Sequence, residues 1–332
     1  MWRQLRDALN STGRPIWLYT SPHSGTPGTP VAATGVSAPW HSSHPYAPPP
    51  DWDAETIRGL ANSMMFQYVN LFDYWYGSHW GSPTSPPGGL ITNIDAMVAL
   101  QQRSGVAKGG SISGPGFWAD AQQLEICNFG EQLNAFGGPN PVGMTLEEYR
   151  SHYSIWAMFA SPMVLGVDLR GLEKRHPKCL AMIKNVALLA IARDSGATPG
   201  VLVSQTTNLS APSVAQTRSS NIVEQIFARN LHDSGGGIAV CFFNRDEKPR
   251  RMNISWAALG LPSGPAKRTV RNVWTAESSE AVGGVDATVG KHEIALFRVK
   301  TDDDDVFLTE SPGGLRAQLH RQGHRRLRFG DP

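Results

Sequence analysis

The sequence is poor in cysteine and in charge, and it has no long apolar run. Its three cysteines, Cys127, Cys179 and Cys241, are too few and too scattered for a disulfide framework or a zinc site, so we expect three buried thiols. Charged residues make up 17% of the 332 residues and the formal net charge is +2, which favours no charged partner. No basic stripe with interleaved aromatics predicts a nucleic-acid surface, and no apolar run of about 18 residues predicts a membrane span.

The first residues lack the character of a signal peptide. Met1 is followed by W-R-Q-L rather than by an apolar core, so the chain begins like the middle of a protein and its compartment is left open. Motifs of the form N-x-S/T begin at Asn10, Asn208 and Asn253. They would permit glycosylation in a secreted protein, although three such matches are not rare by chance.

Glycine, proline and tryptophan are plentiful, with 34, 24 and 10 residues respectively. Many tryptophans in a chain of low charge suit a protein that stacks rings, and sugars are the commonest ring ligands of that kind. The alternative is that most of these indoles belong to the core. The length allows a sizeable core and more than one domain. Composition therefore favours a carbohydrate ligand but specifies no reaction.

The most informative segment begins at a turn, Gly114–Gly116, which is followed by a short apolar stretch carrying polar side chains. Asp120, Gln122 and Gln123 are interleaved with apolar residues there, a pattern that suits a strand ending at the mouth of a barrel. We therefore expect a strand that delivers active-site polar groups.

A helix and a second strand are predicted to follow. Thr145 and Glu148 have the spacing of a capping box and begin a helix that we expect to be buried on one face. Residues 163–167 form a continuous apolar run of strand length that ends at Asp168. A parallel strand would deliver Asp168 to a site; the alternative is that Asp168 and Arg170 only cap the next helix. Turn, strand, helix and strand together are the repeating unit of a parallel α/β barrel.

The other elements divide the chain into two parts and a tail. Helices are predicted at 2–10, 53–61, 91–103 and 177–193, strands at 14–19 and 64–69, and a long loop at 21–50. After about residue 200 the sequence pattern changes to that of short strands separated by turns. The strands are predicted at 222–228, 237–243, 251–256, 267–274 and 291–299, and together they predict an antiparallel sandwich. We therefore expect a partial barrel domain at 1–200, a β-sandwich at 201–300 and a disordered tail at 301–332.

Several short motifs occur within roughly residues 3–300, and their order and spacing are more specific than any one of them. They are R-P-I-W-L from Arg14, A-N…D-Y-W from Ala61, G-P-G-F-W-A-D from Gly114, N-F-G from Asn128, G-M-T-L-E-E-Y from Gly143, A-S-P-M from Ala160, D-L-R from Asp168, V-C-F-F-N-R near Val240 and V-R-N-V-W-T near Val270. This pattern resembles the α-galactosidase and melibiase family of retaining glycoside hydrolases, known as family 27. The resemblance implies a (β/α)8 barrel that binds a terminal α-galactoside at its C-terminal face, followed by a β-sandwich.

The implied chemistry needs two carboxyl groups about 5 to 5.5 Å apart, one as nucleophile and one as acid and base. In the family the nucleophile is an Asp at the end of the fourth strand. By the resemblance, residue 1 falls in the helix after that strand, so we expect the first four strands and the nucleophile to be missing from this chain. No metal or organic cofactor is implied, because the reaction uses protein carboxyl groups.

The remaining catalytic position is also altered. Counting back from Trp75 by the family's spacing places Asn70 at the position of the acid/base Asp and Phe66 at that of an Arg. An amide has no ionisable proton to give, and losing acid/base help typically costs about 10²- to 10⁴-fold in rate. Asp73 could take this role only if a gap in the comparison with the family were placed differently. The family carries a separate Asp at the spacing that Asp73 has from Trp75.

Among the substrate-binding positions that the resemblance implies, some are retained and others are not. Trp118 and Asp120 are retained, and Asp168 stands at the end of the strand predicted at 163–167. Gln122 replaces the second Asp of an N-D-P-D motif, and Ser21 lies near the position of the fifth-strand acid.

Three functional hypotheses follow. The first is an α-galactosidase-like hydrolase represented by an incomplete chain, and the second is a catalytically inactive carbohydrate-binding descendant, which the residues at positions 66, 70 and 122 favour. The third is a product without a site, in which only the β-domain folds. The resemblance allows a homodimer, and half a barrel with open strand edges is expected to be poorly soluble unless it is paired.

Overall fold

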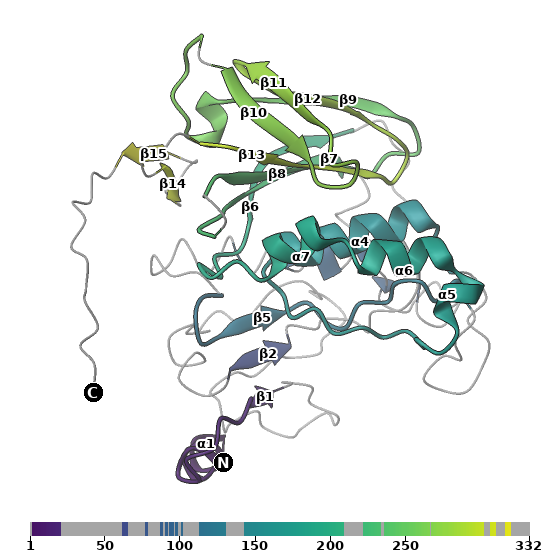
Figure 1. The fold of residues 1–332 in the computed structure, drawn as a ribbon, viewed down its shortest axis with the longest axis vertical. Helices are drawn as coiled ribbons and strands as arrows, with labels where there is room; N and C mark the ends of the chain where they lie inside the picture. The colour runs from purple at the N-terminus through teal and green to yellow at the C-terminus, as the bar shows by residue number, and fades with distance from the viewer. Residues whose placement is uncertain are drawn as a thin grey trace.

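The computed structural model describes residues 2–20, 62–65, 77–78, 87–88, 90–91, 93–95, 97–98, 101, 113–130, 143–208, 222–233, 236–265, 267–301, 306–309 and 316–319. Figure 1 shows the described elements in layers: a small sheet at the N-terminal end, a group of helices, and a larger β-structure on the other side of the helices. No helix within these ranges is long and apolar enough to cross a membrane.

The N-terminal sheet is parallel. Its three strands are β1 (Tyr19–Thr20), β2 (Ser63–Met65) and β5 (Trp118–Asp120), in the order β1-β2-β5, and helix α1 (Trp2–Asn10) precedes them. The predicted strand at 14–19 is thus formed only at its end. The predicted strand at 163–167 makes a single parallel bridge, between Leu165 and Leu124. Because parallel strands end at one edge of a sheet, Asp120 at the end of β5 lies at the edge at which β1 and β2 also end.

Helix α4 (Leu146–Met158) begins with the predicted capping box. The Thr145 hydroxyl accepts a hydrogen bond from the Glu148 amide at 3.2 Å, and the Glu148 carboxylate accepts one from the Thr145 amide at 2.8 Å. The expectation that one face would be buried is wrong, because every residue from Ser151 to Met158 is buried. Figure 1 shows the reason: α4 lies between the parallel sheet and the β-structure, so apolar surface covers it on opposite sides.

The helix predicted at 177–193 is two helices, preceded by the short helix α5 (Leu172–Arg175). Helix α6 (Pro177–Ile183) ends before Asn185, and α7 (Val186–Ala192) begins after it. Asn185 is extended and its side chain accepts a hydrogen bond from the Leu188 amide at 3.0 Å, which makes it an N-cap. The apolar pattern continues across the break, so periodicity alone predicted one helix.

The C-terminal β-structure is antiparallel, as predicted. A six-stranded sheet has the order β11-β10-β13-β8-β7-β6, and a separate pair has the order β12-β9. The strands are β6 (Val201–Thr207), β7 (Ile222–Asn230), β8 (Ile238–Asn244), β9 (Arg250–Ser255), β10 (Lys267–Asn272), β11 (Ser278–Val282), β12 (Gly284–Val289) and β13 (Ile294–Val299), with a 3-10 helix at Ala257–Leu259. The five predicted strands are confirmed, whereas β6, β11 and β12 were not predicted as strands. The core between the two sheets includes Trp256 and Phe242, both fully buried.

Two short antiparallel pairs complete the described strands. They are β3 (Gly77–Ser78) with β4 (Pro87–Gly88), and β14 (Val306–Thr309) with β15 (Arg316–Leu319). The second pair lies in the tail that was expected to be disordered, so a part of that tail forms a ladder. The domain limits at residues 200 and 300 stay predictions.

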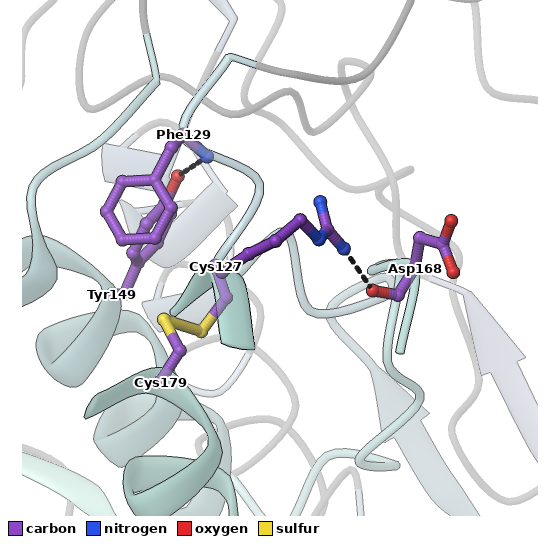
Figure 2. Close-up of a disulfide and its surroundings, with 6 residues drawn as sticks. Cys127, Phe129, Tyr149, Asp168 and Cys179 are labelled. Carbon is purple, nitrogen blue, oxygen red and sulfur yellow. Dashed lines mark hydrogen bonds between the residues drawn. A yellow bond between two sulfur atoms is a disulfide. The ribbon is translucent and has the colours of Figure 1, made fainter. Parts of the chain in front are cut away.

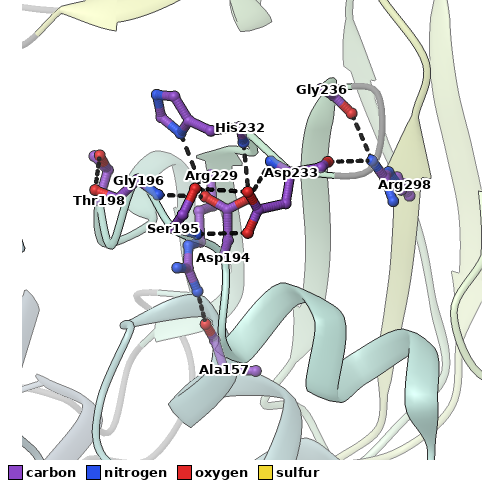
Figure 3. Close-up of polar contacts among 10 residues, drawn as sticks. All are labelled: Ala157, Asp194, Ser195, Gly196, Thr198, Arg229, His232, Asp233, Gly236 and Arg298. Carbon is purple, nitrogen blue, oxygen red and sulfur yellow. Dashed lines mark hydrogen bonds and ion pairs between the residues drawn. The ribbon is translucent and has the colours of Figure 1, made fainter. Parts of the chain in front are cut away.

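A cluster of polar contacts joins the end of α7 to the sandwich (Figure 3). Asp194 is buried, and its carboxylate accepts hydrogen bonds from the amides of His232, Asp233 and Gly196 at 2.7, 2.8 and 3.2 Å. The fully buried Arg229 lies beside it and donates to the carbonyl of Ala157 at the end of α4. Burial lowers the pKa of Arg229 to about 10, and the negative charge of Asp194 opposes this shift. Asp194 therefore stabilises both the loop backbone and a buried cation.

Candidate functional site

The candidate site lies at the C-terminal edge of the parallel sheet and is centred on Asp120. Asp120 is the last residue of β5 and is 3% exposed. Its carboxylate forms hydrogen bonds with the side chains of Tyr19 and Ser161 and accepts one from the Gln122 amide at 2.8 Å. Burial raises the pKa of Asp120 to about 6, and the three hydrogen bonds oppose part of that rise. This carboxyl group can therefore gain or lose a proton near neutral pH.

Tyr19 reaches Asp120 from the opposite strand of the sheet. Burial raises its pKa first, and the negative charge of Asp120 and their hydrogen bond raise it further. The phenol therefore stays protonated, and its O–H donates a hydrogen bond to the Asp120 carboxylate. Tyr19 was not among the predicted site residues, although a strand was predicted there.

Two tryptophans share the same face of the sheet. Trp17 and Trp118 are stacked with ring centroids 5.0 Å apart and an interplanar angle of 25°. The Trp17 indole N–H donates to the Ser63 hydroxyl of the central strand at 3.0 Å. Side chains two residues apart on a strand point to the same face, so alternation from Trp118 to Asp120 and from Trp17 to Tyr19 was the signal that could have identified Trp17 and Tyr19.

Gln122 begins the loop that follows β5. Its backbone has a φ of 85°, a left-handed conformation that is uncommon for a residue with a side chain, and its carbonyl accepts a hydrogen bond from the buried Trp156 indole at 2.7 Å. Further along the loop the Glu125 carboxylate accepts hydrogen bonds from Gln123 at 2.5 Å and from Asn128 at 2.6 Å. The loop is thus held by α4 and by its own side chains.

A disulfide also holds this loop, contrary to the sequence prediction. Cys127 and Cys179 are bonded, with their Cα atoms 5.9 Å apart, so the expectation of three free thiols is wrong for these two (Figure 2). Cys241 is a buried free thiol, as predicted, and burial raises its pKa. The bond connects the loop after β5 to helix α6, and the neighbouring Phe129 amide donates to the Tyr149 hydroxyl of α4 at 2.5 Å.

The close packing of this loop explains the glycine of the G-M-T motif. A Cβ atom at Gly143 would lie 2.2 Å from the carbonyl carbon of Phe129, which no side chain tolerates. Only glycine allows the two backbone segments to approach this closely.

Asp168 pairs with Arg170 and does not cap helix α5, which has Gly171 as its N-cap and no side-chain capping hydrogen bond. Its carboxylate accepts hydrogen bonds from the Arg170 amide at 2.9 Å and from the Arg170 guanidinium, with a shortest distance of 2.7 Å, and its carbonyl accepts one from Arg175 at 2.9 Å. The hydrogen bonds from Arg170 lower the pKa of Asp168. The carboxylate is thus already paired just before helix α5, and its role in substrate binding stays a prediction.

Four predicted site residues lie outside the described residues: Ser21, Phe66, Asn70 and Asp73. The site as described therefore brings together Asp120 and Trp118 of the predicted set, with Gln122 directly after them. In the part of the chain that the structure describes, no group of three or more His, Cys, Asp or Glu side chains could hold a metal ion.

Comparison with known proteins identifies both parts of the chain. Residues 224–299 match the family described as the α-galactosidase C-terminal β-sandwich domain. The chain is 28% identical over 189 residues to α-galactosidase 3 of Arabidopsis thaliana, covering 56% of this chain and 36% of that protein. It is 23% identical over 304 residues to α-galactosidase A of Cellvibrio japonicus, covering 89% of this chain and 58% of that protein.

Solved structures agree over most of the chain. α-Galactosidase I of Mortierella vinacea superposes with a TM-score of 0.61 at 20% identity, covering 90% of this chain and 62% of that one. A family 27 β-L-arabinopyranosidase of Geobacillus stearothermophilus gives a TM-score of 0.60 at 18% identity, covering 91% of this chain and 54% of that one.

These matches settle the fold. The parallel sheet with helices α4–α7 corresponds to the C-terminal half of a (β/α)8 barrel, and an antiparallel β-sandwich follows it. The chain spans between about a third and a half of the length of the plant α-galactosidases that it matches, at 36%, 37% and 45% of their sequences. Residues 224–299 thus match the C-terminal β-sandwich of α-galactosidases, and the fold of the chain is similar to that of α-galactosidases and of a family 27 arabinopyranosidase.

Proposed function

We propose that this chain is the sugar-binding C-terminal part of an α-galactosidase-like retaining glycoside hydrolase that acts on terminal α-galactosides. The observation that carries the proposal is Asp120: a buried carboxyl group at the carboxyl end of a parallel strand, beside Trp118, with its pKa raised to about 6 by burial. A group that is costly to bury in charged form, and is nevertheless kept there, is typical of a functional site.

Asp120 is assigned to sugar binding rather than to the covalent chemistry. Its carboxylate is oriented by Tyr19, Ser161 and the Gln122 amide, so its remaining lone pairs have a fixed direction. A sugar hydroxyl can donate to such a carboxylate, and the adjacent indole of Trp118 can pack against the apolar face of a pyranose ring. The family's acid/base position is Asn70 in this chain, and because an amide cannot transfer a proton there, proton transfer is assigned to Asp73 as the substitute.

A second candidate is carbohydrate binding without turnover. It is favoured by Gln122, whose amide stands where the family carries a carboxyl group and whose backbone is held in a left-handed conformation by Trp156 and Asp120. An amide can hydrogen-bond a sugar but cannot act as an acid or base at neutral pH. The two candidates share the binding site and differ only in chemistry.

Replacing Asp120 with asparagine is expected to weaken galactose binding about 10- to 100-fold, because a buried acceptor of a charged hydrogen bond is lost. Calorimetric titration with galactose measures this loss, and Asp286→Asn, an exposed change on the sandwich, is the matched control. The free energy of unfolding at pH 7 is expected not to fall in Asp120→Asn, since the folded state no longer holds a buried charge whose pKa lies above its unfolded value.

Turnover separates the two candidates. Because the nucleophile is expected to be missing from this chain, Asn70→Asp alone should not restore turnover. Hydrolysis of 4-nitrophenyl α-D-galactoside by the wild-type chain would overturn that expectation and support the hydrolase, whereas galactose binding without hydrolysis supports the binding descendant. A folded wild-type chain that binds no galactoside would contradict both. A homodimer stays a prediction, which light scattering of the same samples tests.

A further inference from the structure

A buried histidine connects the sandwich to helix α4, at a distance from the candidate site. His292 lies in the turn between β12 and β13, has a φ of 55°, and is 6% exposed. Its carbonyl accepts a hydrogen bond from the Ser151 hydroxyl of α4 at 2.8 Å. The turn itself is fixed by Asn244, whose side-chain amide donates to the carbonyls of Val289 and Gly290 at 3.1 and 2.8 Å. The imidazole therefore has a defined position against the helix.

Both ring nitrogens of His292 face carboxylates. Nδ1 lies 2.7 Å from Glu148 Oε1 on α4, and Nε2 lies 3.1 Å from Glu247 Oε1 in the turn after β8. An ionised carboxylate only accepts hydrogen bonds, and a neutral imidazole has only one N–H to donate. Both contacts can be hydrogen bonds only if the ring carries two protons and a positive charge.

We propose that His292 is a doubly protonated cation that clamps the β-sandwich to helix α4 through Glu148 and Glu247, and that loss of one proton releases half of this clamp. Docking of the two domains then depends on the charge of this ring. We call this group of three side chains the histidine clamp.

The charges around the clamp favour the cation. Glu148 has its pKa lowered by the hydrogen bond from His292 and by the Thr145 amide, against the effect of its burial. The pKa of Glu247 is also lowered, first by Lys291 and then by His292, so both carboxylates stay ionised in mildly acidic solution. Lys291 forms an ion pair with Glu247, and the negative charge of Glu148 attracts it as well.

The other charged groups of these turns are occupied elsewhere. Asp246 pairs with Arg250 at 2.5 Å, and Arg250 also pairs with Glu224. Glu293 accepts a hydrogen bond from the Gly290 amide at 3.2 Å. On α4, the guanidinium of Arg150 lies over the ring of Trp274, 5.3 Å from its centroid. The two glutamates are thus the carboxylates that hold the ring.

The clamp is connected to the candidate site through the helix. Glu148 also closes the capping box of α4, and the next residue, Tyr149, holds the Phe129 amide in the loop after β5. Weakening the clamp therefore loosens the first turn of α4, which supports the loop beside Asp120.

Three variants test the proposal by thermal unfolding between about pH 5.5 and pH 8.5, the range spanned by histidine ionisation. As the pH rises through this range, the Tm of the wild-type chain is expected to fall by about 5 °C more than that of His292→Gln, because each lost hydrogen-bonded contact shifts Tm by a few degrees. Glu247→Gln should retain docking but lose the pH dependence, since an amide can accept from an N–H or donate to a bare ring nitrogen. Glu277→Gln, an exposed change, is the control and should behave as wild type.

A direct measurement accompanies the unfolding curves. In chains labelled with 15N-histidine, the long-range 1H–15N spectrum near pH 6 should show two protonated nitrogens for the ring whose signals disappear in His292→Gln. A single protonated nitrogen for that ring, or the same pH dependence of Tm in wild type and Glu247→Gln, would overturn the proposal. Neither readout uses sugar binding or hydrolysis, so its outcome is independent of the proposed function.

Discussion

Replacing both Cys127 and Cys179 with alanine is expected to lower the free energy of unfolding by about 4 kcal/mol, because their disulfide closes a loop across 52 residues and removes that loop's conformational entropy from the unfolded chain. Urea unfolding of the oxidised proteins measures the difference. The effect should be accompanied by weaker galactose binding, since Cys127 lies in the loop that follows Asp120 and is joined through the bond to α6.

The reduced wild-type chain provides the control for this experiment. With a strong thiol reductant present, wild type and the double variant should unfold at the same urea concentration. Equal stability of the wild type and the double variant without reductant would show that the bond does not form in solution, or that the unfolded chain is already restricted between these two positions.

Replacing Asp194 with alanine is expected to cost about 3 to 5 kcal/mol, the usual result of removing one partner from a buried pair of charges. The change leaves three loop amides without their acceptor and leaves the fully buried Arg229 without the nearby negative charge (Figure 3). Because Asp194, just after α7, holds the loop between β7 and β8, the loss of stability should be accompanied by faster hydrogen exchange at the amides of His232 and Asp233.

Two matched variants distinguish the loss of charge from the loss of the hydrogen-bond acceptor. Asp194→Asn keeps one acceptor oxygen and should cost less, about 1 to 3 kcal/mol. The neighbouring Asp233→Asn changes an exposed carboxylate that binds Ser195 and should have little effect. If Asp194→Ala were no more destabilising than Asp233→Asn, Arg229 would have another compensating partner.

Local patterns predicted the elements whose cause is local. The capping box of Thr145 and Glu148 was visible in the sequence because it depends on residues three positions apart. The sandwich strands were visible either by alternation, as in β9, or as a short continuous apolar run, as in β8. The helix pattern at 177–193 failed at Asn185, where a side-chain cap interrupts an apolar period that itself continues.

The candidate site was predictable only in part. Trp118 and Asp120 were predicted on a strand that ends at a barrel mouth, and the structure places them at the end of a parallel strand, while their role in sugar binding stays a prediction. Tyr19 and Trp17 were missed, because alternation could place them on one face of their segment but only their contacts with β5 across the central strand bring that face to the candidate site.

The sequence by itself determined the likeness to α-galactosidases, the order of most elements and the fold class of a partial barrel followed by a sandwich, because these follow from motifs and from hydrophobic periods within short segments. Only the tertiary structure decided that Cys127 and Cys179 are bonded, that Asp120 is buried beside Tyr19, and that His292 lies between Glu148 and Glu247. Each of these depends on residues that are distant in the chain, 144 positions apart for Glu148 and His292. The physical reason is that bonds, burial and the charge state of a side chain are set by what packs against it, and packing brings together segments whose local sequences carry no record of one another.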